Sequence, residues 1–144
     1  MENIIIRRLK TEDGSEIGEI HAAITGEPLE TDFERIVSQQ AGRAEDVSFV
    51  AEHNGSVVGY MISSILTGIF GIKKSAWIAM MGVHPQFMGR GIGESLAEEL
   101  FRLAKAQGLA DVYTSVRWDS TDLLSFCKTL GFDRSNFINL IKRL

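Results

Sequence analysis

A glycine-rich turn between two contrasting segments places the strongest constraint on how this chain folds. Residues 76–83 are nearly all apolar and lie between polar or turn residues, which is typical of a strand buried on both faces. Pro85 ends that strand, because proline has no amide hydrogen to donate. Three glycines then follow at alternate positions, Gly89, Gly91 and Gly93. Without a Cβ, they let the backbone take left-handed conformations and approach a ligand closely.

An amphipathic helix is predicted directly after the turn. Apolar residues recur there at helical spacing, and Gly108 is a suitable stop. The unpaired N–H groups and the dipole at the start of such a helix attract anions, and Arg90 adds a cationic donor. The turn is neither a dinucleotide fingerprint, because Glu94 stands at the third glycine position, nor a P-loop, because Gly-Lys-Ser/Thr is absent. We therefore predict a phosphate-binding loop, with a ligand-free connection as the alternative.

The order strand, V-x-P-x-x-x-G-x-G-I-G, helix resembles the acetyl-CoA signature of the GNAT superfamily of N-acetyltransferases. The resemblance implies acetyl-CoA as cosubstrate, with its pyrophosphate held mainly by backbone N–H groups. Met88 departs from the family, which usually has Gln or Arg there, so one side-chain contact is lost. The residues implied in acetyl-CoA binding are Met81, Gly82, Val83, Met88, Gly89, Arg90, Gly91, Ile92, Gly93, Glu94 and Ser120.

Hydrophobic periodicity predicts the elements of the remaining chain. Asn54-Gly55, between two apolar runs, predicts a tight hairpin, and Gly59 predicts a bulge or a close packing approach in its second strand. Helices are predicted over about residues 11–24 and 32–40, and from Asp119 or Ser120 to Gly131. Strands are predicted over residues 3–9, 47–53, 56–65, 76–83, 111–117 and 137–143.

This order of elements resembles the GNAT fold over essentially the whole chain. The resemblance implies an α/β (α+β) fold, with a mixed, mostly antiparallel sheet of about six or seven strands flanked by about four helices. Central strands ending at Val83 and Val116 would diverge and hold CoA between them. Residues 116–132 match a second family run, ending in Leu130-Gly131-Phe132. Ser120, Leu123 and Cys127 replace the usual Asn, Ala and Tyr of that run.

Composition limits the class of protein. With 144 residues, 44% hydrophobic and 24% charged, we expect one soluble domain over residues 1–144. No apolar run reaches the length of a membrane span and no signal peptide is evident, so we expect a cytoplasmic protein without a membrane partner. The net charge of −4 disfavours nucleic-acid binding. One cysteine and three scattered histidines indicate neither an intrachain disulfide nor a metal site.

The resemblance implies direct attack of an amine on the thioester of acetyl-CoA in a ternary complex. Backbone N–H groups near residues 81–83 would stabilise the oxyanion. Cys127 stands where the family has its acidic tyrosine, and three interpretations stay open: a core residue, a weak acid, or a covalent nucleophile. Tyr60 and Tyr113 are alternative sources of a hydroxyl group.

Two residues are candidates for the base. His84 directly follows the buried strand, and imidazole titrates near pH 6.5 in model peptides; Glu52 lies near the end of another strand. Both also suit ordinary strand-end positions. His21 lies on or beside an apolar helix face and is interpreted as a core or boundary histidine rather than a catalytic one. Near the second helix, acidic residues either attract an acceptor amine or occupy a solvated helix start: Glu27, Glu30, Asp32 and Glu34.

The sequence therefore predicts an acyltransferase that moves an acetyl group from acetyl-CoA to a primary amine of a small molecule or a protein. The alternative is a GNAT-fold protein that binds acyl-CoA without efficient catalysis, as a sensor or assembly subunit. A homodimer stays open, since no interface is evident in the sequence. The acceptor amine is not specified by any of these residues.

Overall fold

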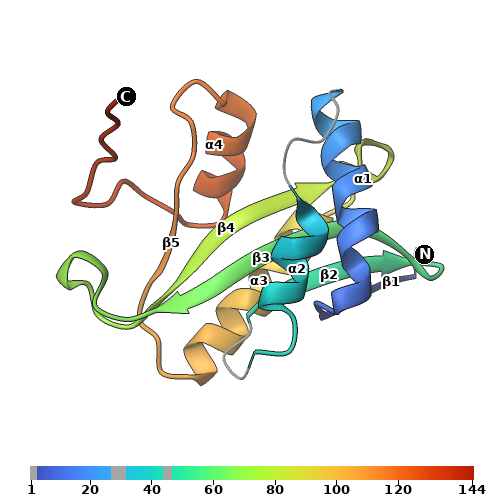
Figure 1. Cartoon of the computed structure of the whole chain (residues 1–144), viewed down its shortest axis with the longest axis horizontal. Helices are drawn as coiled ribbons and strands as arrows, with labels where there is room; N and C mark the ends of the chain where they lie inside the picture. Colours follow the sequence, from blue (N-terminus) through green and yellow to red (C-terminus); the bar gives the residue numbers. More distant parts are fainter. Residues whose placement is uncertain (1–2, 27–31, 44–46) are drawn as a thin grey trace.

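A mixed five-stranded sheet organises the computed structural model, which describes residues 3–26, 32–43 and 47–144 (Figure 1). The strands follow one another across the sheet in chain order. The first four pair antiparallel, and the last pair is parallel. The strands are β1 (Ile4–Arg8), β2 (Phe49–His53), β3 (Ser56–Leu66), β4 (Ser75–Val83) and β5 (Val112–Thr114).

Helices cover both faces of this sheet, which confirms the predicted α/β class (Figure 1). On one face lie α1 (Gly14–Thr25) and α2 (Phe33–Gln40); on the other lies α3 (Ile92–Ala106), and α4 (Thr121–Thr129) follows β5. Short 3-10 turns cover Thr11–Asp13, Ile69–Gly71 and Pro85–Phe87. No helix in the described ranges is long and apolar enough to cross a membrane.

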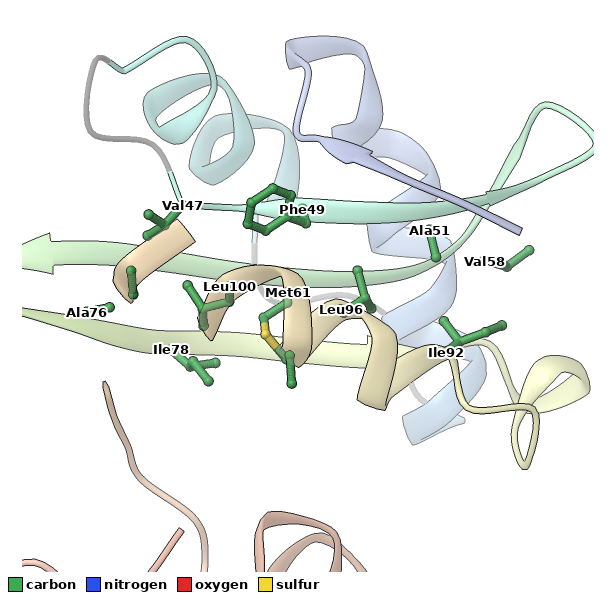
Figure 2. Close-up of a cluster of buried hydrophobic side chains, with 12 residues drawn as sticks. Val47, Phe49, Ala51, Val58, Met61, Ala76, Ile78, Ile92, Leu96 and Leu100 are labelled. Atoms are coloured by element: carbon green, nitrogen blue, oxygen red, sulfur yellow. The ribbon is translucent and has the colours of Figure 1, made fainter. Parts of the chain in front are cut away.

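Two hydrophobic cores result, one on each face. The α3-side core packs Leu96 and Leu100 against sheet residues that include Phe49 and Met61 (Figure 2). These two leucines are four residues apart and therefore lie on one face of α3, as the periodicity of the sequence predicts. The α1-side core contains Ile17, Ile20, Phe33, Val37 and Tyr60.

The predicted hairpin and the predicted role of Gly59 are both confirmed. Asn54 (φ 51°) and Gly55 (φ 82°) both take the left-handed conformation that a two-residue hairpin turn requires. Gly59 pairs with Ala51 while Val57 pairs with Glu52, so the strand bulges next to Gly59. A Cβ on Gly59 would also lie 2.9 Å from Cγ2 of Ile92, so this glycine lets α3 approach the sheet.

Three sequence predictions about strands are wrong. The sheet has five strands rather than six or seven, and residues 137–143 form no strand. The predicted strand over residues 111–117 is limited to Val112–Thr114, because the chain diverges from β4 after that point. The terminal segment consequently has no long neighbouring edge to pair with, and strand propensity alone does not form a ladder. Its apolar side chains point to solvent; Ile138 and Leu140 are 82% and 88% exposed.

Candidate active site

The site is built where β4 and β5 separate. The two strands pair only from Ala76 opposite Val112 to Ile78 opposite Thr114. The Oγ1 hydroxyl of Thr114 donates to the carbonyl oxygen of Ile78 at 3.1 Å, across this last pair. Beyond Ile78, no described strand pairs with this edge of β4. The central strands therefore diverge, as the family resemblance implied.

A bulge in β4 lies at the same point. On its other edge, β4 pairs Met80 with Ile62 and Ile78 with Ser63, so Ala79 has no opposite residue. Such bulges redirect the strand and are frequent next to active sites. The second half of β4 is also less buried than the first, and the prediction of burial on both faces holds only for its first half. The second half of β4 is less buried because a gap opens between it and the chain that follows β5.

A cavity of about 230 Å³ occupies this gap. Its walls include members of the α3-side core, such as Ile78, and of the α1-side core, such as Tyr60. Side chains from both faces of the sheet therefore meet at the opening between the strands. The lining residues are His21, Tyr60, Ile78, Ala79, Met80, Met81, Thr114, Ser115, Val116 and Leu123.

Tyr60 is the buried phenol of this cavity. It lies on β3 opposite Gly82 and is only 2% exposed. Burial raises the pKa of Tyr60 to about 12, so its hydroxyl stays protonated at neutral pH. A Cβ on Gly82 would lie 2.9 Å from Cε1 of this ring and 2.9 Å from Cδ1 of Ile24 on α1. The absence of a side chain at Gly82 thus makes room for both residues.

His21 also lines the cavity, which the sequence did not indicate. Its ring lies 5.0 Å from that of Phe33, which in turn meets Tyr60 edge-on at 6.2 Å. The helical pattern places His21 beside the apolar stripe of α1 correctly. It gives no sign of a cavity there, because the gap arises from the separation of β4 and β5, far along the chain.

The glycine-rich turn has the open backbone that a phosphate-binding loop needs. Gly89 (φ 80°) and Gly91 (φ 77°) are left-handed, and no described atom lies within 4 Å of a Cβ placed on either. Gly91 is the N-cap of α3, and its carbonyl accepts a hydrogen bond from the Ser95 N–H at 3.0 Å. Gly93 serves a different purpose, since a Cβ there would lie 3.0 Å from Cζ of Phe126 on α4.

The side chains around the turn differ in their surroundings. Met88 and Glu94 are not buried in the core, whereas Ile92 belongs to the α3-side core and offers only its backbone to a ligand. The Arg90 guanidinium lies over the Phe87 ring, with Cζ 4.8 Å from the ring centre. The first N–H groups of an α-helix have no carbonyl partner within the helix, so the start of α3 suits an anion.

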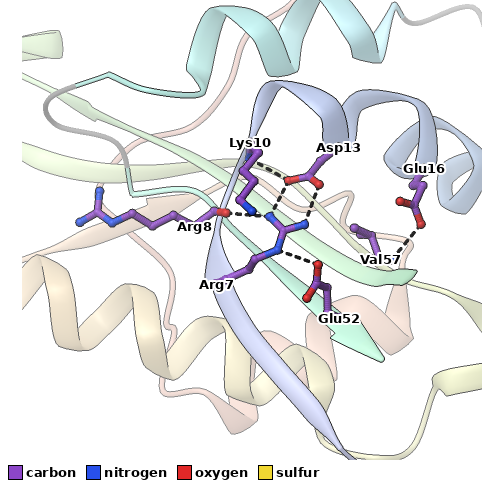
Figure 3. A network of polar contacts seen from close by, with 7 residues as sticks. All are labelled: Arg7, Arg8, Lys10, Asp13, Glu16, Glu52 and Val57. Carbon is purple, nitrogen blue, oxygen red and sulfur yellow. Dashed lines mark hydrogen bonds and ion pairs between the residues drawn. The ribbon is translucent and has the colours of Figure 1, made fainter. Parts of the chain in front are cut away.

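The two predicted bases lie outside the cavity lining. Glu52 on β2 accepts a hydrogen bond from Nε of Arg7 at 2.9 Å, and Arg7 also pairs with the buried Asp13 at 2.8 Å (Figure 3). His84 follows β4, and its Nδ1 accepts a hydrogen bond from the Gln86 N–H at 3.1 Å. Both have structural partners, and their roles as base stay predictions.

Cys127 is buried on α4 and is absent from the cavity lining. Leu123, one helical turn earlier, reaches the cavity instead. Burial raises the pKa of the Cys127 thiol, which disfavours the thiolate that a covalent nucleophile would need. Ser120 is the N-cap of α4, and its carbonyl accepts from the Leu124 N–H at 2.9 Å.

The acidic residues predicted to attract an acceptor divide into two groups. Glu27 and Glu30 lie outside the described residues. Asp32 caps α2 by accepting a hydrogen bond from the Arg35 N–H at 3.1 Å. Glu34 lies against α1, where a Cβ on Gly14 would be 2.7 Å from its Cα. For Asp32 and Glu34, these contacts favour the role of ordinary residues at a helix start over the attraction of an acceptor amine.

Comparisons with known proteins agree with this geometry. The model of the acetyltransferase (GNAT) family matches residues 15–132. An acetyltransferase of Pectobacterium atrosepticum is 33% identical over 113 residues, which are 78% of this chain and 76% of that protein.

Solved structures share the fold at lower identity. An aminoglycoside N-acetyltransferase in complex with CoA superposes with a TM-score of 0.81 at 15% identity, over 99% of this chain and 96% of that one. The ribosomal-protein-S18-alanine N-acetyltransferase of Escherichia coli gives 0.76 at 20% identity, over 93% and 80%. Since the family match spans the glycine-rich turn and every residue that lines the cavity, the chain belongs to the acetyltransferase (GNAT) family.

Proposed function

We propose that this acetyltransferase moves the acetyl group of acetyl-CoA to the nitrogen of a primary amine. The observation that carries the proposal is the cavity at the point where β4 and β5 separate, on the same strand that leads into the glycine-rich turn. A donor with a phosphate end and an acyl end needs both features along one strand, with the cavity beside the strand and the phosphate-binding turn after its end. The order of β4, turn and α3 provides them.

The phosphates of acetyl-CoA bind at the turn. Backbone N–H groups of residues 89–94 surround them, and the open space at Gly89 and Gly91 admits the pyrophosphate. The pantetheine arm, which carries amides, lies along the unpaired edge of β4 at Met81, Gly82 and Val83, as an added strand would. Ser120, the N-cap of α4, is the predicted side-chain contact with the same arm.

The acetyl transfer proceeds by direct attack. The neutral amine forms a bond to the thioester carbon, the carbonyl electrons move to oxygen, and the C–S bond then breaks as the carbonyl re-forms. Backbone N–H groups near residues 81–83 stabilise the oxyanion. Cys127, which is buried outside the cavity lining, stays a candidate acid for the departing thiolate, and Tyr60 is the alternative hydroxyl group within the lining. Holding both reactants together supplies roughly 7 kcal/mol or more of the barrier reduction.

The acceptor enters from the face covered by α1 and α2. Tyr60 and Met80, which belong to that face, line the cavity together with His21 of α1. Relatives of this fold bear names of aminoglycoside and ribosomal-protein-alanine acetyltransferases, and both acceptors present a primary amine. A small-molecule amine and a protein amine are therefore the two classes to test.

A thiol-release assay with acetyl-CoA and an amine panel tests the proposal. The panel contains aminoglycosides, polyamines, free lysine, and peptides with free N-termini. We expect saturable CoA release with at least one amine, and mass spectrometry of the product should show one added acetyl group. Failure of acetyl-CoA to bind in calorimetry would refute the proposal.

Binding without turnover on any amine would favour the second candidate, an acyl-CoA-binding protein without efficient catalysis. The observation behind that candidate is the cysteine at the position of the family's tyrosine, buried away from the cavity. Calorimetry and the amine panel together distinguish the two candidates.

A further inference from the structure

We infer that His21 is the general base that takes the proton from the acceptor amine before it attacks. The inference rests on the proposed function, since it assigns a role within that reaction. It concerns a side chain of α1 that the helical pattern of the sequence places in the core or at its boundary.

The position of His21 follows from the way α1 crosses the sheet. Ile24 lies close above Gly82, because its Cδ1 would be 2.9 Å from a Cβ there. His21 is three residues earlier and therefore lies on the same helix face. That face directs His21 to the wall of the cavity, together with Tyr60 and Met80. The imidazole thus lies on the side from which the acceptor enters.

The composition of the cavity wall leaves few groups able to accept a proton. Among the described residues, the lining contains no carboxylate, lysine or arginine. Tyr60 and His21 are its titratable members. Tyr60 is a neutral phenol at neutral pH, because burial raises its pKa to about 12. A phenol in that state donates a hydrogen bond but does not remove a proton, so His21 is the remaining base.

The surroundings of His21 hold the ring without occupying its nitrogens. Phe33, itself buried, contacts the imidazole with an interplanar angle of 46° and also meets the ring of Tyr60. Neither ring nitrogen of His21 forms a hydrogen bond with a described residue. By contrast, Nδ1 of His84 accepts from the backbone, and Glu52 is paired with Arg7.

Three carboxylates near the start of α1 have neighbours of their own and are absent from the cavity lining. Asp13 pairs with Arg7, Glu16 accepts from the Val57 N–H at 2.9 Å, and Glu34 lies against Gly14. Gly14 is seven residues before His21, about 10 Å along the helix axis. In the described part of the cavity, the imidazole of His21 is consequently the group that can accept a proton from an amine.

The proton balance of the step is simple. An ammonium group gives one proton to a neutral imidazole nitrogen, and the amine lone pair becomes available for the N–C bond. After the C–S bond breaks, the nitrogen loses its second proton as the amide forms. One proton ends on the departing thiolate, giving free CoA thiol, and one is released to solvent when His21 returns to its neutral form.

His21→Asn tests the inference, because asparagine keeps a polar group of similar size but cannot take the proton. We expect kcat to fall about a hundredfold or more. The Kd of acetyl-CoA should stay within twofold of wild type. The acidic limb of the kcat–pH profile should disappear. In the smaller variant His21→Ala, added imidazole should restore part of the lost rate.

His53→Asn is the matched control, since His53 lies on β2 outside the cavity and its replacement should leave kcat unchanged. If His21→Asn does not fold, the kcat of His21→Gln and the rescue of His21→Ala by imidazole test the same role. A kcat within threefold of wild type in a folded His21 variant would overturn the inference while the proposed function stands. Loss of acetyl transfer in the wild-type protein is the separate failure of the proposed function.

Discussion

The hydroxyl oxygen of Tyr60 lies 3.0 Å from the point that a Cβ on Gly82 would occupy. The two residues are opposite each other on β3 and β4, and Tyr60 lines the cavity. A side chain at position 82 would therefore displace the phenol of Tyr60, the side chain of Ile24 on α1, or both. Gly82 has a packing role here in addition to its predicted contact with acetyl-CoA.

Gly82→Ala should lower the free energy of unfolding by about 1–3 kcal/mol, the usual range for overpacking. Chemical denaturation measures this change. In a Tyr60→Val background the same substitution should cost clearly less, because the ring it strikes is gone. Equal costs in both backgrounds would contradict the proposed clash.

Tyr60 should make stability depend on pH in the alkaline range. Its pKa in the folded protein is about 12, above the ordinary value of 10.0, so the folded state disfavours the phenolate. The stabilisation is complete below pH 10 and is lost as the pH rises from 10 to 12. We expect a loss of roughly 2–3 kcal/mol, seen as a falling denaturation midpoint. Tyr60→Phe should not show this part of the loss.

Gly91→Val should abolish acetyl-CoA binding. A valine at φ 77° is strained, and its side chain fills the open space that the pyrophosphate needs. Gly26→Val is the matched control, because Gly26 has a similar φ of 71° with open surroundings at the end of α1. Both variants should lose about 1–2 kcal/mol of stability, but calorimetry should show lost binding only for Gly91→Val.

Cys127 should react slowly with alkylating reagents in the folded protein. Burial raises the pKa of its thiol and limits access, so iodoacetamide at neutral pH should modify it far more slowly than after denaturation. Cys127→Ala should retain kcat within about threefold if Leu123, rather than Cys127, is the α4 residue at the reaction site. A roughly hundredfold loss of turnover would instead support the predicted role of the thiol as acid.

Arg7 should be important for stability although it lies outside the cavity lining. Hydrogen bonds to Asp13 and Glu52 raise the pKa of its guanidinium, and Asp13 is buried. Arg7→Gln leaves that carboxylate without its cationic partner, and we expect a loss of about 3 kcal/mol. Arg102→Gln breaks the exposed pair with Glu99 and should cost far less, because solvent screens that pair. Thermal denaturation compares the two.

Most of the local structure is predictable from the sequence for identifiable reasons. Asn54-Gly55, the glycine-rich turn and the stripe of α3 each depend on neighbouring residues, and their chemistry is readable from a short window. The strand predicted over residues 137–143 is wrong because an apolar pattern suits a strand, whereas a strand also needs a partner. β5, with three residues, gives this segment little to pair with.

The cavity is less predictable than the turn. His21 and Tyr60 are 39 positions apart, and both are far in sequence from Thr114 and Ser115 on the opposite wall. Their meeting depends on the register of the sheet and on where β5 leaves it. Glu52 and His84 are suggested by their places at strand ends, but an ion pair with Arg7 and a backbone hydrogen bond occupy them.

The hydrogen bond from Thr114 to the carbonyl of Ile78 has a consequence for how this catalyst can change. It marks the last closed rung between two parallel strands, and the rungs that are missing after it determine how deep the opening in the sheet extends. One additional pair of residues between β4 and β5 would narrow the opening, and one fewer would widen it, because the residues at this point line the cavity. The length of β5 therefore sets the depth of the opening in which the proposed reaction takes place.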